Sequence, residues 1–496
     1  MLALSIFGAV FNPARSIGQS DKQTHGPTDI PARIQRVEDG LLPDNVIKGQ
    51  PLPLMKLLDR MKYYETPGVS IAVINNYKIE WARGYGVREL RGNEAVTPDT
   101  LFQAASISKP VTAMAALRLV QQGKLSLDED VNTRLRSWKV AENDFTRDRK
   151  VTVRGILTHT AGFDVLFYEG TPVGEPLPTA LQVLNGEKPA PNTTIQVVYT
   201  PGSRNVYSGG GFLVLQQLLV DVTGKPFPQL MDELVFRPLG IKSSTFKQPL
   251  PQNLQTRAAA GSSEGEPIKG KWLIKPNMAS GGLWTTPSDI ARFVIELQKD
   301  RLGKSNKVLT KETANLMLPP RESQTSVGDG ASIKVRGLGL SVTSESQNIH
   351  FNHGGYTTGY RCEMVGFGNG QGVVVMTNGK SQALLREIMR SIAKEYGWAA
   401  PEYSPRERTL VALDPQVLGE YVGEYEFPEG RNPRITVVSV KDGQLRLDGA
   451  RLRAESETRF FGVGEATYIF VKDENGKVRE MIYDVGFLKL AAKKIK

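Results

Sequence analysis

Cysteine and histidine are scarce in this chain of 496 residues. The one cysteine, Cys362, excludes a disulfide bond within the chain, which fits a reducing compartment without requiring one. With one cysteine and four histidines, the sequence has few ligands for a zinc site built from Cys and His, and we expect none.

Runs of like charge are also missing. The net charge is +10 at pH 7, but lysines and arginines are scattered among acidic residues, as in NDFTRDRK (143–150). Nucleic-acid-binding surfaces gather basic residues, whereas mixed charges are typical of a solvated surface. We therefore expect no nucleic-acid partner.

Long apolar runs are missing too. The first residues, MLALSIFGAVFNPARS, contain an apolar run of roughly ten residues, far below the ~20 that a spanning helix needs. This run resembles the apolar region of a signal peptide but lacks a preceding positive charge and a clear small-x-small cleavage site. We expect no integral membrane segment. A periplasmic or secreted location and a cytoplasmic one both stay open, with export slightly favoured.

The length and the changes of texture along the chain predict a main domain and a smaller β module. A chain of 496 residues exceeds one ordinary core. We assign residues 1–50 to an irregular lead-in or residual signal region, 51–398 to the main domain, 399–413 to a linker and 414–496 to a small β-barrel. Short strands separated by turns indicate the barrel.

Strands flanking helices, without strict βαβ alternation, place the main domain in the α+β class. Apolar periodicity and turn residues predict the following elements: a hairpin over 68–87 around Asn75-Asn76, a helix from Ser106 to Gly123, a helix over 287–300, strands over 334–378 and a helix over 381–398.

The stretch FQAASISKPVTAMAA (102–116) places a serine and a lysine three residues apart where the apolar helix begins. On a helix, Ser106 and Lys109 would share a face with Cβ atoms about 5–6 Å apart, so a buried amine could accept the hydroxyl proton. The helix start also offers free backbone N–H groups to a developing oxyanion. The alternative interpretation is a serine N-cap followed by a surface lysine.

Two further segments carry chemistry of the same kind. Tyr207 lies in a turn before another helix, and a tyrosine beside a serine–lysine pair can move a proton to a leaving group. In NHGGYTTGY (352–360), Gly354 and Gly355 would let a substrate approach the backbone, where an N–H could complete an oxyanion hole. Taken alone, each segment is an ordinary turn.

Together and in this order, these segments resemble the serine β-lactamase and penicillin-binding protein superfamily, particularly its class C branch with related esterases and D-aminopeptidases. The blocks VTVRGILTHTAGF, YTPGSRNVYSGGGF, FRPLGIKSSTF, ASGGLWTTPSDIARF and VVVMTNG also follow the family order. The resemblance covers residues 50–398. It implies an antiparallel sheet covered by helices beside a mostly helical lobe, with the site between them and no metal or cofactor.

The resemblance also implies a role for each motif residue. Ser106 is the nucleophile, Lys109 its hydrogen-bonded base and Tyr207 the second proton carrier. His353 takes the third-motif position usually held by lysine or histidine, and the backbone N–H groups of Ser106 and Tyr356 form the oxyanion hole. With Gly354 and Gly355, His353 would line the substrate site.

One position departs from the family. The second motif is commonly Tyr-x-Asn, and here Gly209 replaces the asparagine whose amide helps to hold the lysine and an amide-bearing substrate. The absence of this amide weakens the case for an efficient β-lactamase or peptidase more than the case for an esterase, because an ester needs less help at the leaving group. His159, in LTHTAGF, matches a family block outside the catalytic positions, and we assign it to structure.

Two other patterns could indicate a different site, namely a nucleophile elbow around Ser263 and a metal site at His350 and His353. GSSEG (261–265) satisfies the nucleophile-elbow pattern around Ser263, but that motif needs a preceding strand and a following helix, which the flanking residues do not predict. His350 and His353 have no further soft ligand nearby except Cys362, which we expect to be a buried strand residue.

We therefore expect a metal-free serine hydrolase with a Ser106 acyl-enzyme, acting on a small ester, β-lactam or short peptide. A carboxylesterase is favoured; a class C-type β-lactamase or a D-stereospecific peptidase is the alternative within the class, and an inactive ligand-binding protein is the alternative outside it. The C-terminal residues resemble the lipocalin-like module often appended to such hydrolases, as a lid or as a stabilising or dimerisation module. The sequence leaves the oligomeric state open.

Overall fold

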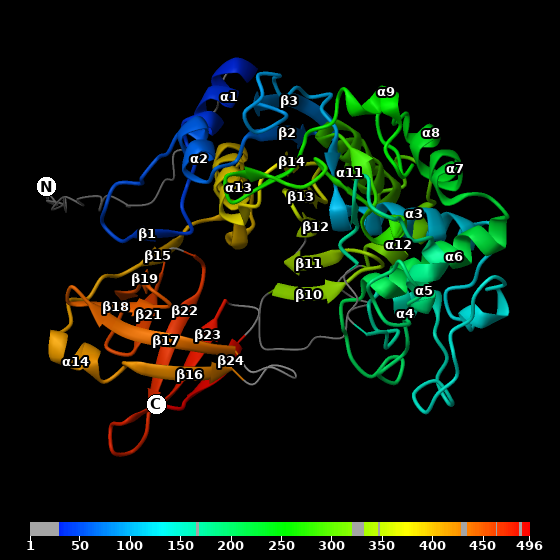
Figure 1. Ribbon diagram of the computed structural model, residues 1–496. Helices are drawn as coiled ribbons and strands as arrows, with labels where there is room; N and C mark the ends of the chain where they lie inside the picture. The colour runs from blue at the N-terminus through cyan, green and yellow to red at the C-terminus, as the bar shows by residue number, and fades with distance from the viewer. Residues whose placement is uncertain are drawn as a thin grey trace, which may run out of the picture.

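The computed structural model shows a main domain and a smaller C-terminal barrel (Figure 1). It describes residues 29–164, 168–319, 332–345, 348–427, 434–462, 464–485 and 489–496. The signal-like residues 1–16 lie outside this part of the chain.

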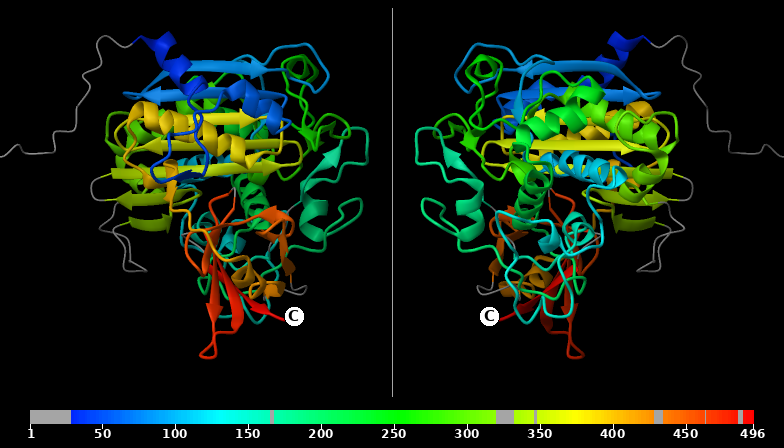
Figure 2. Two further views of the ribbon diagram at one scale, coloured as in Figure 1. Left: turned by 90° about the vertical axis from the view of Figure 1, so that its left-hand side faces the viewer. Right: turned by 90° about the vertical axis from the view of Figure 1, so that its right-hand side faces the viewer.

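A seven-stranded antiparallel sheet forms the centre of the main domain (Figures 1 and 2). Its strands follow the order β10 (Ser332–Arg336), β11 (Ser341–Glu345), β12 (Asn348–Thr357), β13 (Tyr360–Phe367), β14 (Gly372–Thr377), β2 (Gly68–Asn75) and β3 (Lys78–Gly86). The predicted hairpin around Asn75-Asn76 is confirmed: Asn76 and Tyr77 have φ values of 51° and 59°, as a two-residue turn of this kind requires.

Both faces of the sheet are buried because successive side chains point to opposite sides. Along β2, Val69, Ile71 and Val73 join one cluster, which packs under α13 (Gln382–Tyr396), α1 (Ile30–Glu38) and α2 (Leu57–Tyr63). Ala72 and Ile74 join the other cluster, which continues through α11 (Pro287–Arg301) into the helical lobe. The predicted α+β architecture is confirmed.

The lobe surrounds two buried helices, α3 (Ser108–Gln121) and α6 (Gly209–Thr223). Its shorter elements are α4 (Val153–Leu157), α5 (Ala180–Asn185), α7 (Phe227–Met231), α8 (Arg237–Leu239), α9 (Gln252–Gln255), α10 (Met278–Gly281) and α12 (Lys311–Met317), with the strand pairs β4 (Phe102–Gln103) and β9 (Trp284–Thr285), β5 (Thr171–Pro172) and β8 (Leu273–Ile274), and β6 (Ser262–Ser263) and β7 (Glu266–Pro267). None of the helices in the described ranges combines the length and apolarity that crossing a bilayer needs.

The segment expected to be an irregular lead-in is partly regular. Asp29 caps α1 by accepting a hydrogen bond from Ala32 N–H, and β1 (Asn45–Ile47) pairs in parallel with β15 (Arg406–Arg408). The polar composition of α1 hid its short apolar stripe, in which Val37 is buried and Ile34 is partly buried against α13.

The C-terminal module is a nine-stranded, nearly closed barrel that follows α14 (Pro415–Gly419). Its strands are β16 (Gly423–Phe427), β17 (Arg434–Lys441), β18 (Gln444–Leu447), β19 (Ala450–Arg451), β20 (Arg453–Ala454), β21 (Arg459–Phe461), β22 (Thr467–Lys472), β23 (Val478–Asp484) and β24 (Lys489–Lys494). The end strands β19 and β20 are separated only by Leu452, and Tyr421, Tyr425, Phe460 and Phe470 fill the interior. The predicted barrel is confirmed.

Candidate active site

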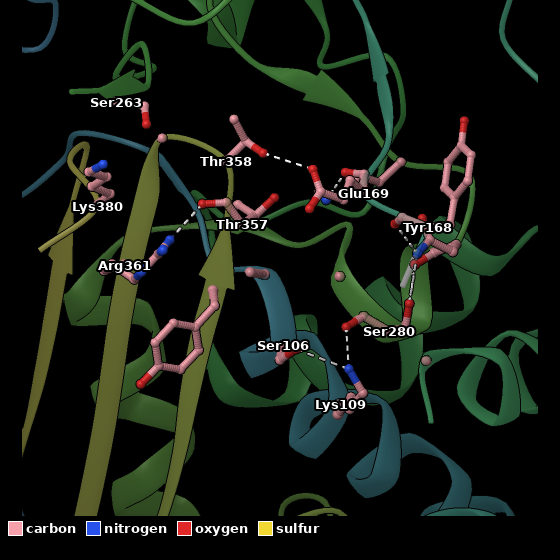
Figure 3. A pocket seen from close by; sticks show the side chains of 17 residues that line it. Ser106, Lys109, Tyr168, Glu169, Ser263, Ser280, Thr357, Thr358, Arg361 and Lys380 are labelled. Atoms are coloured by element: carbon pink, nitrogen blue, oxygen red, sulfur yellow. Dashed lines mark hydrogen bonds between the residues drawn. The ribbon is translucent and has the colours of Figure 1, made fainter. Parts of the chain in front are cut away.

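Ser106 and Lys109 lie together at the entrance to α3, as the sequence predicts (Figure 3). Ser106 occupies a short 3-10 turn, Ala105–Ile107, and therefore is not the N-cap of the helix. Lys109 is 2% exposed, and its Nζ donates to Ser106 Oγ at 3.1 Å and to the Ser280 carbonyl at 2.8 Å. The alternative of a surface lysine is wrong, because the amine is buried against the serine.

Tyr207 contacts the same hydroxyl from the turn that precedes α6. Its phenol donates to Ser106 Oγ at 2.8 Å, and its ring centroid lies 4.7 Å from Lys109 Nζ. The Ser106 hydroxyl oxygen therefore contacts an amine from the same helix entrance and a phenol from a segment about a hundred residues further along the chain.

His159 holds the backbone on both sides of Tyr207. Its carbonyl accepts from Val206 N–H at 2.8 Å, and its Nδ1 accepts from Ser208 N–H at 3.1 Å. Its ring centroid lies 4.4 Å from that of Tyr207, and its φ of +60° is uncommon for a residue with a side chain. The sequence analysis assigned His159 to structure, and nothing in the pattern indicated that it supports this particular tyrosine.

Strand β12 brings the third motif to the cluster. The His353 ring centroid lies 6.5 Å from that of Tyr207, and His353 Nδ1 lies 2.7 Å from the Gly354 carbonyl oxygen. At Gly355, a Cβ atom would lie 2.2 Å from the Ala104 carbonyl oxygen. Glycine is therefore required here for contact between the strand and the turn that carries Ser106, in addition to any approach by substrate.

These elements border a cavity of about 380 Å³. Its lining residues are Ala105, Ser106, Lys109, Tyr168, Glu169, Gly209, Ser263, Lys275, Asn277, Ser280, Gly281, Tyr356, Thr357, Thr358, Gly359, Arg361 and Lys380. Figure 3 shows Ser106 at its floor, with Arg361 and Thr357 on one wall and Tyr168 and Ser280 on the other. Ser263 reaches the rim from the β6–β7 hairpin, where no helix follows, so it does not form a nucleophile elbow.

The missing asparagine at Gly209 does not leave Lys109 without an acceptor. The Ser280 carbonyl takes one of its hydrogen bonds, and an amide from another segment, Asn277, lines the cavity. Asn277 Nδ2 donates to the Tyr168 carbonyl at 3.1 Å and to Ser280 Oγ at 3.0 Å. The expected gap at Gly209 is thus partly filled by Asn277, which no motif identified, and by Ser280, which lies in a family block without an assigned role.

Lys275 is a second amine that the sequence analysis missed. It follows β8, is 4% exposed and lines the same cavity as Ser106. Burial lowers the pKa of Lys275 to about 8; the nearby Glu169 carboxylate opposes this effect and Lys109 adds to it. No local pattern distinguishes this lysine from a surface one, because its burial arises from distant segments.

His350 and Cys362 lie outside the cavity lining, as do the rings of His159 and His353, and the fourth histidine, His25, lies outside the described residues. His350 Nε2 is 2.5 Å from Glu402 Oε1, and Cys362 is fully buried, with burial raising the pKa of its thiol to about 12. Within the described residues, no group of three or more metal-ligating side chains converges.

The fold and this cluster define a serine hydrolase of the β-lactamase type. Residues 56–395 match the sequence model of the Beta-lactamase family, and the chain belongs to that family. Protein Rv1367c of Mycobacterium tuberculosis is 32% identical over 290 residues, covering 52% of this chain and 70% of that protein. The teichoic acid D-alanine hydrolase of Staphylococcus aureus is 21% identical over 306 residues, covering 60% and 71%. The octameric penicillin-binding protein homologue from Pyrococcus abyssi superposes with a TM-score of 0.61 at 20% identity, covering 88% of this chain and 98% of that chain.

Proposed function

We propose that this protein is a carboxylesterase that works through an acyl-enzyme on Ser106. One observation carries the proposal: Ser106 Oγ lies 3.1 Å from Lys109 Nζ and 2.8 Å from Tyr207 OH, at the floor of a cavity large enough for a small ester. Such contacts are within the range required of a nucleophile and its proton carriers.

In the proposed reaction, Ser106 Oγ attacks the ester carbonyl as Lys109 accepts its proton. The tetrahedral intermediate then collapses, Tyr207 donates its proton to the departing alcohol oxygen, and the tyrosine oxygen takes back the proton that Lys109 accepted from Ser106. Water attacks the acyl-enzyme with the same groups acting in reverse and releases the acid.

The oxyanion would be held by the backbone N–H groups of Ser106 and Tyr356. Thr357 and Tyr360 flank a two-residue turn, so they form a hydrogen-bonded pair in the antiparallel ladder. The next pair, Tyr356 with Arg361, is then a non-hydrogen-bonded pair, and the Tyr356 N–H points away from β13. Strand β11 pairs with β12 only as far as Asn352, so β11 does not use this N–H, and Gly355 brings the strand against Ala104, close to Ser106.

A second candidate is hydrolysis of a β-lactam or of a D-aminoacyl bond. The teichoic acid D-alanine hydrolase and the penicillin-binding protein homologue among the similar proteins support it. Asn277 supports it as well, because its amide lines the cavity although Gly209 offers no side chain. We place this candidate second because the Asn277 amide already donates both hydrogens, to the Tyr168 carbonyl and to Ser280 Oγ, and has none left for a substrate.

Steady-state rates with three chromogenic substrates test the proposal: p-nitrophenyl butyrate, a cephalosporin and D-alanine p-nitroanilide. The expected result is that the ester has the highest kcat/KM and that Ser106→Ala lowers it by at least a thousandfold. Faster turnover of the cephalosporin or of the anilide would replace the esterase with the second candidate. Unchanged ester turnover in Ser106→Ala would contradict both.

A further inference from the structure

Lys275 is an incompletely satisfied cation in the wall of the catalytic cavity. Its ammonium carries three donors, and among the described residues it has one acceptor, the Glu169 carbonyl. No carboxylate of the described chain lies within 4 Å of its Nζ, although the Glu169 side chain acts on it through space. Glu169 directs a carboxylate oxygen elsewhere, accepting from Thr358 Oγ1 at 3.0 Å (Figure 3).

The free-energy cost of burying the Lys275 ammonium favours the binding of an anion beside it. A buried ammonium is expensive unless it is paired or fully hydrogen-bonded. Because the pKa of Lys275 is about 8, the amine is still mostly protonated at pH 7. A purely structural contact with the Glu169 carbonyl does not need a charge, whereas an anion in the cavity would use the two remaining donors.

A neighbouring group is also unsatisfied on the same wall. Asn277 is 7% exposed, and its Oδ1 is a buried acceptor without a hydrogen-bond partner. Its orientation is fixed, because Nδ2 donates to the Tyr168 carbonyl and to Ser280 Oγ. The wall formed by residues 275–280 therefore offers a positive charge and, separately, an acceptor.

The other cations around the cavity are better compensated. Lys380 pairs with Glu264 at 2.6 Å, and Arg361 donates to the Thr357 and Tyr360 carbonyls at 2.9 and 2.8 Å. Arg361 belongs to the β12–β13 wall, opposite Ser280 in Figure 3. Lys109, the other buried amine in the lining, donates to two acceptors, so Lys275 is the less compensated of the two.

We propose that Lys275 forms a carboxylate-binding subsite and that the natural substrate carries a carboxylate group bound on this wall while its ester reaches Ser106. Asn277 Oδ1 accepts an N–H or O–H of the same substrate. This inference deepens the proposed function and rests on Ser106 being the nucleophile.

Two matched pairs of esters test the subsite from both ends of the substrate. Monophenyl adipate and phenyl 5-carbamoylpentanoate differ only by a carboxylate against an amide in the acyl group, and 4-acetoxybenzoate and 4-acetoxybenzamide differ likewise in the leaving group. In whichever pair places the carboxylate at Lys275, the anionic ester should have a kcat/KM about ten- to a hundredfold higher than that of its neutral amide counterpart. Lys275→Met should reduce that ratio to near one.

The control is Lys269→Met, which removes an exposed lysine on the same segment as Lys275, where it pairs with Glu175 from a distant loop. It should leave the ratio unchanged. A ratio near one in both pairs for the wild-type protein, or a ratio that survives in Lys275→Met, would overturn the subsite while the esterase stands. Lys275→Gln serves as a second variant if Lys275→Met melts at a much lower temperature.

Binding separates failure of the subsite from failure of the proposed function. Calorimetric titration of Ser106→Ala with glutaramate should show saturable binding that is absent with neutral glutaramide and is lost in Ser106→Ala/Lys275→Met. This result would support the subsite even if no ester is hydrolysed. Absence of glutaramate binding, binding that persists in the double variant, or binding of inorganic phosphate alone would overturn it.

Discussion

The position of Tyr207 is set by contacts that His159 makes with its ring and with the backbone on either side of it. His159 accepts hydrogen bonds from the backbone on both sides of it and packs against its ring. A phenol that must reach Ser106 Oγ is sensitive to small displacements, because about 1 Å of misplacement can cost on the order of a hundredfold in rate. His159 is therefore a positioning residue.

His159→Ala should lower kcat for an ester by about ten- to a hundredfold and change KM by less, because the variant loosens a proton carrier without removing it. His159→Asn should recover part of the rate, since asparagine offers an acceptor and tolerates positive φ. The rates of both variants, with melting temperatures as a check on folding, test this. Equal rates in Ala and wild type would contradict the positioning role.

A pair of buried carboxyl groups should make stability depend on pH. Burial, and then the neighbouring Glu296, raise the pKa of Asp300 to about 8. Because this folded-state pKa lies above the unfolded value near 4, the stabilising contribution is complete below about pH 4 and is lost as the pH rises toward 8.

The wild-type free energy of unfolding should therefore fall by roughly 1 kcal/mol per pH unit relative to Asp300→Asn between about pH 5 and 8. The asparagine mimics the protonated acid, donates to Glu296 and does not titrate. Urea unfolding of both proteins across this range measures the difference. Parallel pH profiles would show that Asp300 is ionised in the folded protein.

At the scale of elements, the clearest sequence patterns were the most reliable. The predicted helix ending at Gly123 is confirmed, since α3 ends at Gln121 and Gly123 has a φ of +69°. The predicted helices over 287–300 and 381–398 correspond to α11 and α13. These segments have strong periodicity and local stop signals, and both are visible in a short window.

The site was only partly predictable, for a physical reason. Ser106, Lys109 and Tyr207 stand in motifs whose chemistry is local, and the structure brings them together. Lys275 and Asn277 matter through burial and through partners about a hundred residues away, such as Glu169 and Tyr168. Such contacts leave no period or spacing in the sequence.

Strand β12 and the Ser106 turn depend on a close backbone contact at Gly355. A methyl group there would lie 2.2 Å from the Ala104 carbonyl oxygen, so Gly355→Ala must push the strand and the turn apart. We expect a loss of kcat of about a hundredfold or more. The matched control is Gly419→Ala, because an added Cβ at Gly419 meets nothing within 4 Å. Ester rates of the two variants would contradict this account if they were equal.

At the scale of the whole molecule, the barrel is tied to the main domain through a buried ion-pair network. Arg390 on α13 is 2% exposed and lies 2.5 Å from Asp44 and 2.8 Å from Glu465 of the barrel. Asn45 adds hydrogen bonds to the Gly462 and Gly464 carbonyls. The predicted linker thus takes part in a structured junction through β15 and β1.

Arg390→Met should lower the melting temperature by roughly 5 °C, because it leaves the buried Asp44 carboxylate and the partly buried Glu465 carboxylate with fewer partners. It should also raise hydrogen exchange in β15. The control is Arg83→Met, which removes a half-exposed partner of Glu38 and should change the melting temperature by about 1 °C or less. Equal shifts in the two variants would show that the junction does not depend on this pair.

Intact-protein mass spectrometry can detect the acyl-enzyme on Ser106. After rapid mixing with p-nitrophenyl butyrate and acid quenching, we expect a mass increase of one butyryl group, mapped by peptide fragmentation to Ser106 and absent in Ser106→Ala. Lys109→Met should abolish the adduct as well. Ester turnover with no adduct at any quench time, or an adduct on another residue that persists in Ser106→Ala, would show that Ser106 is not the nucleophile.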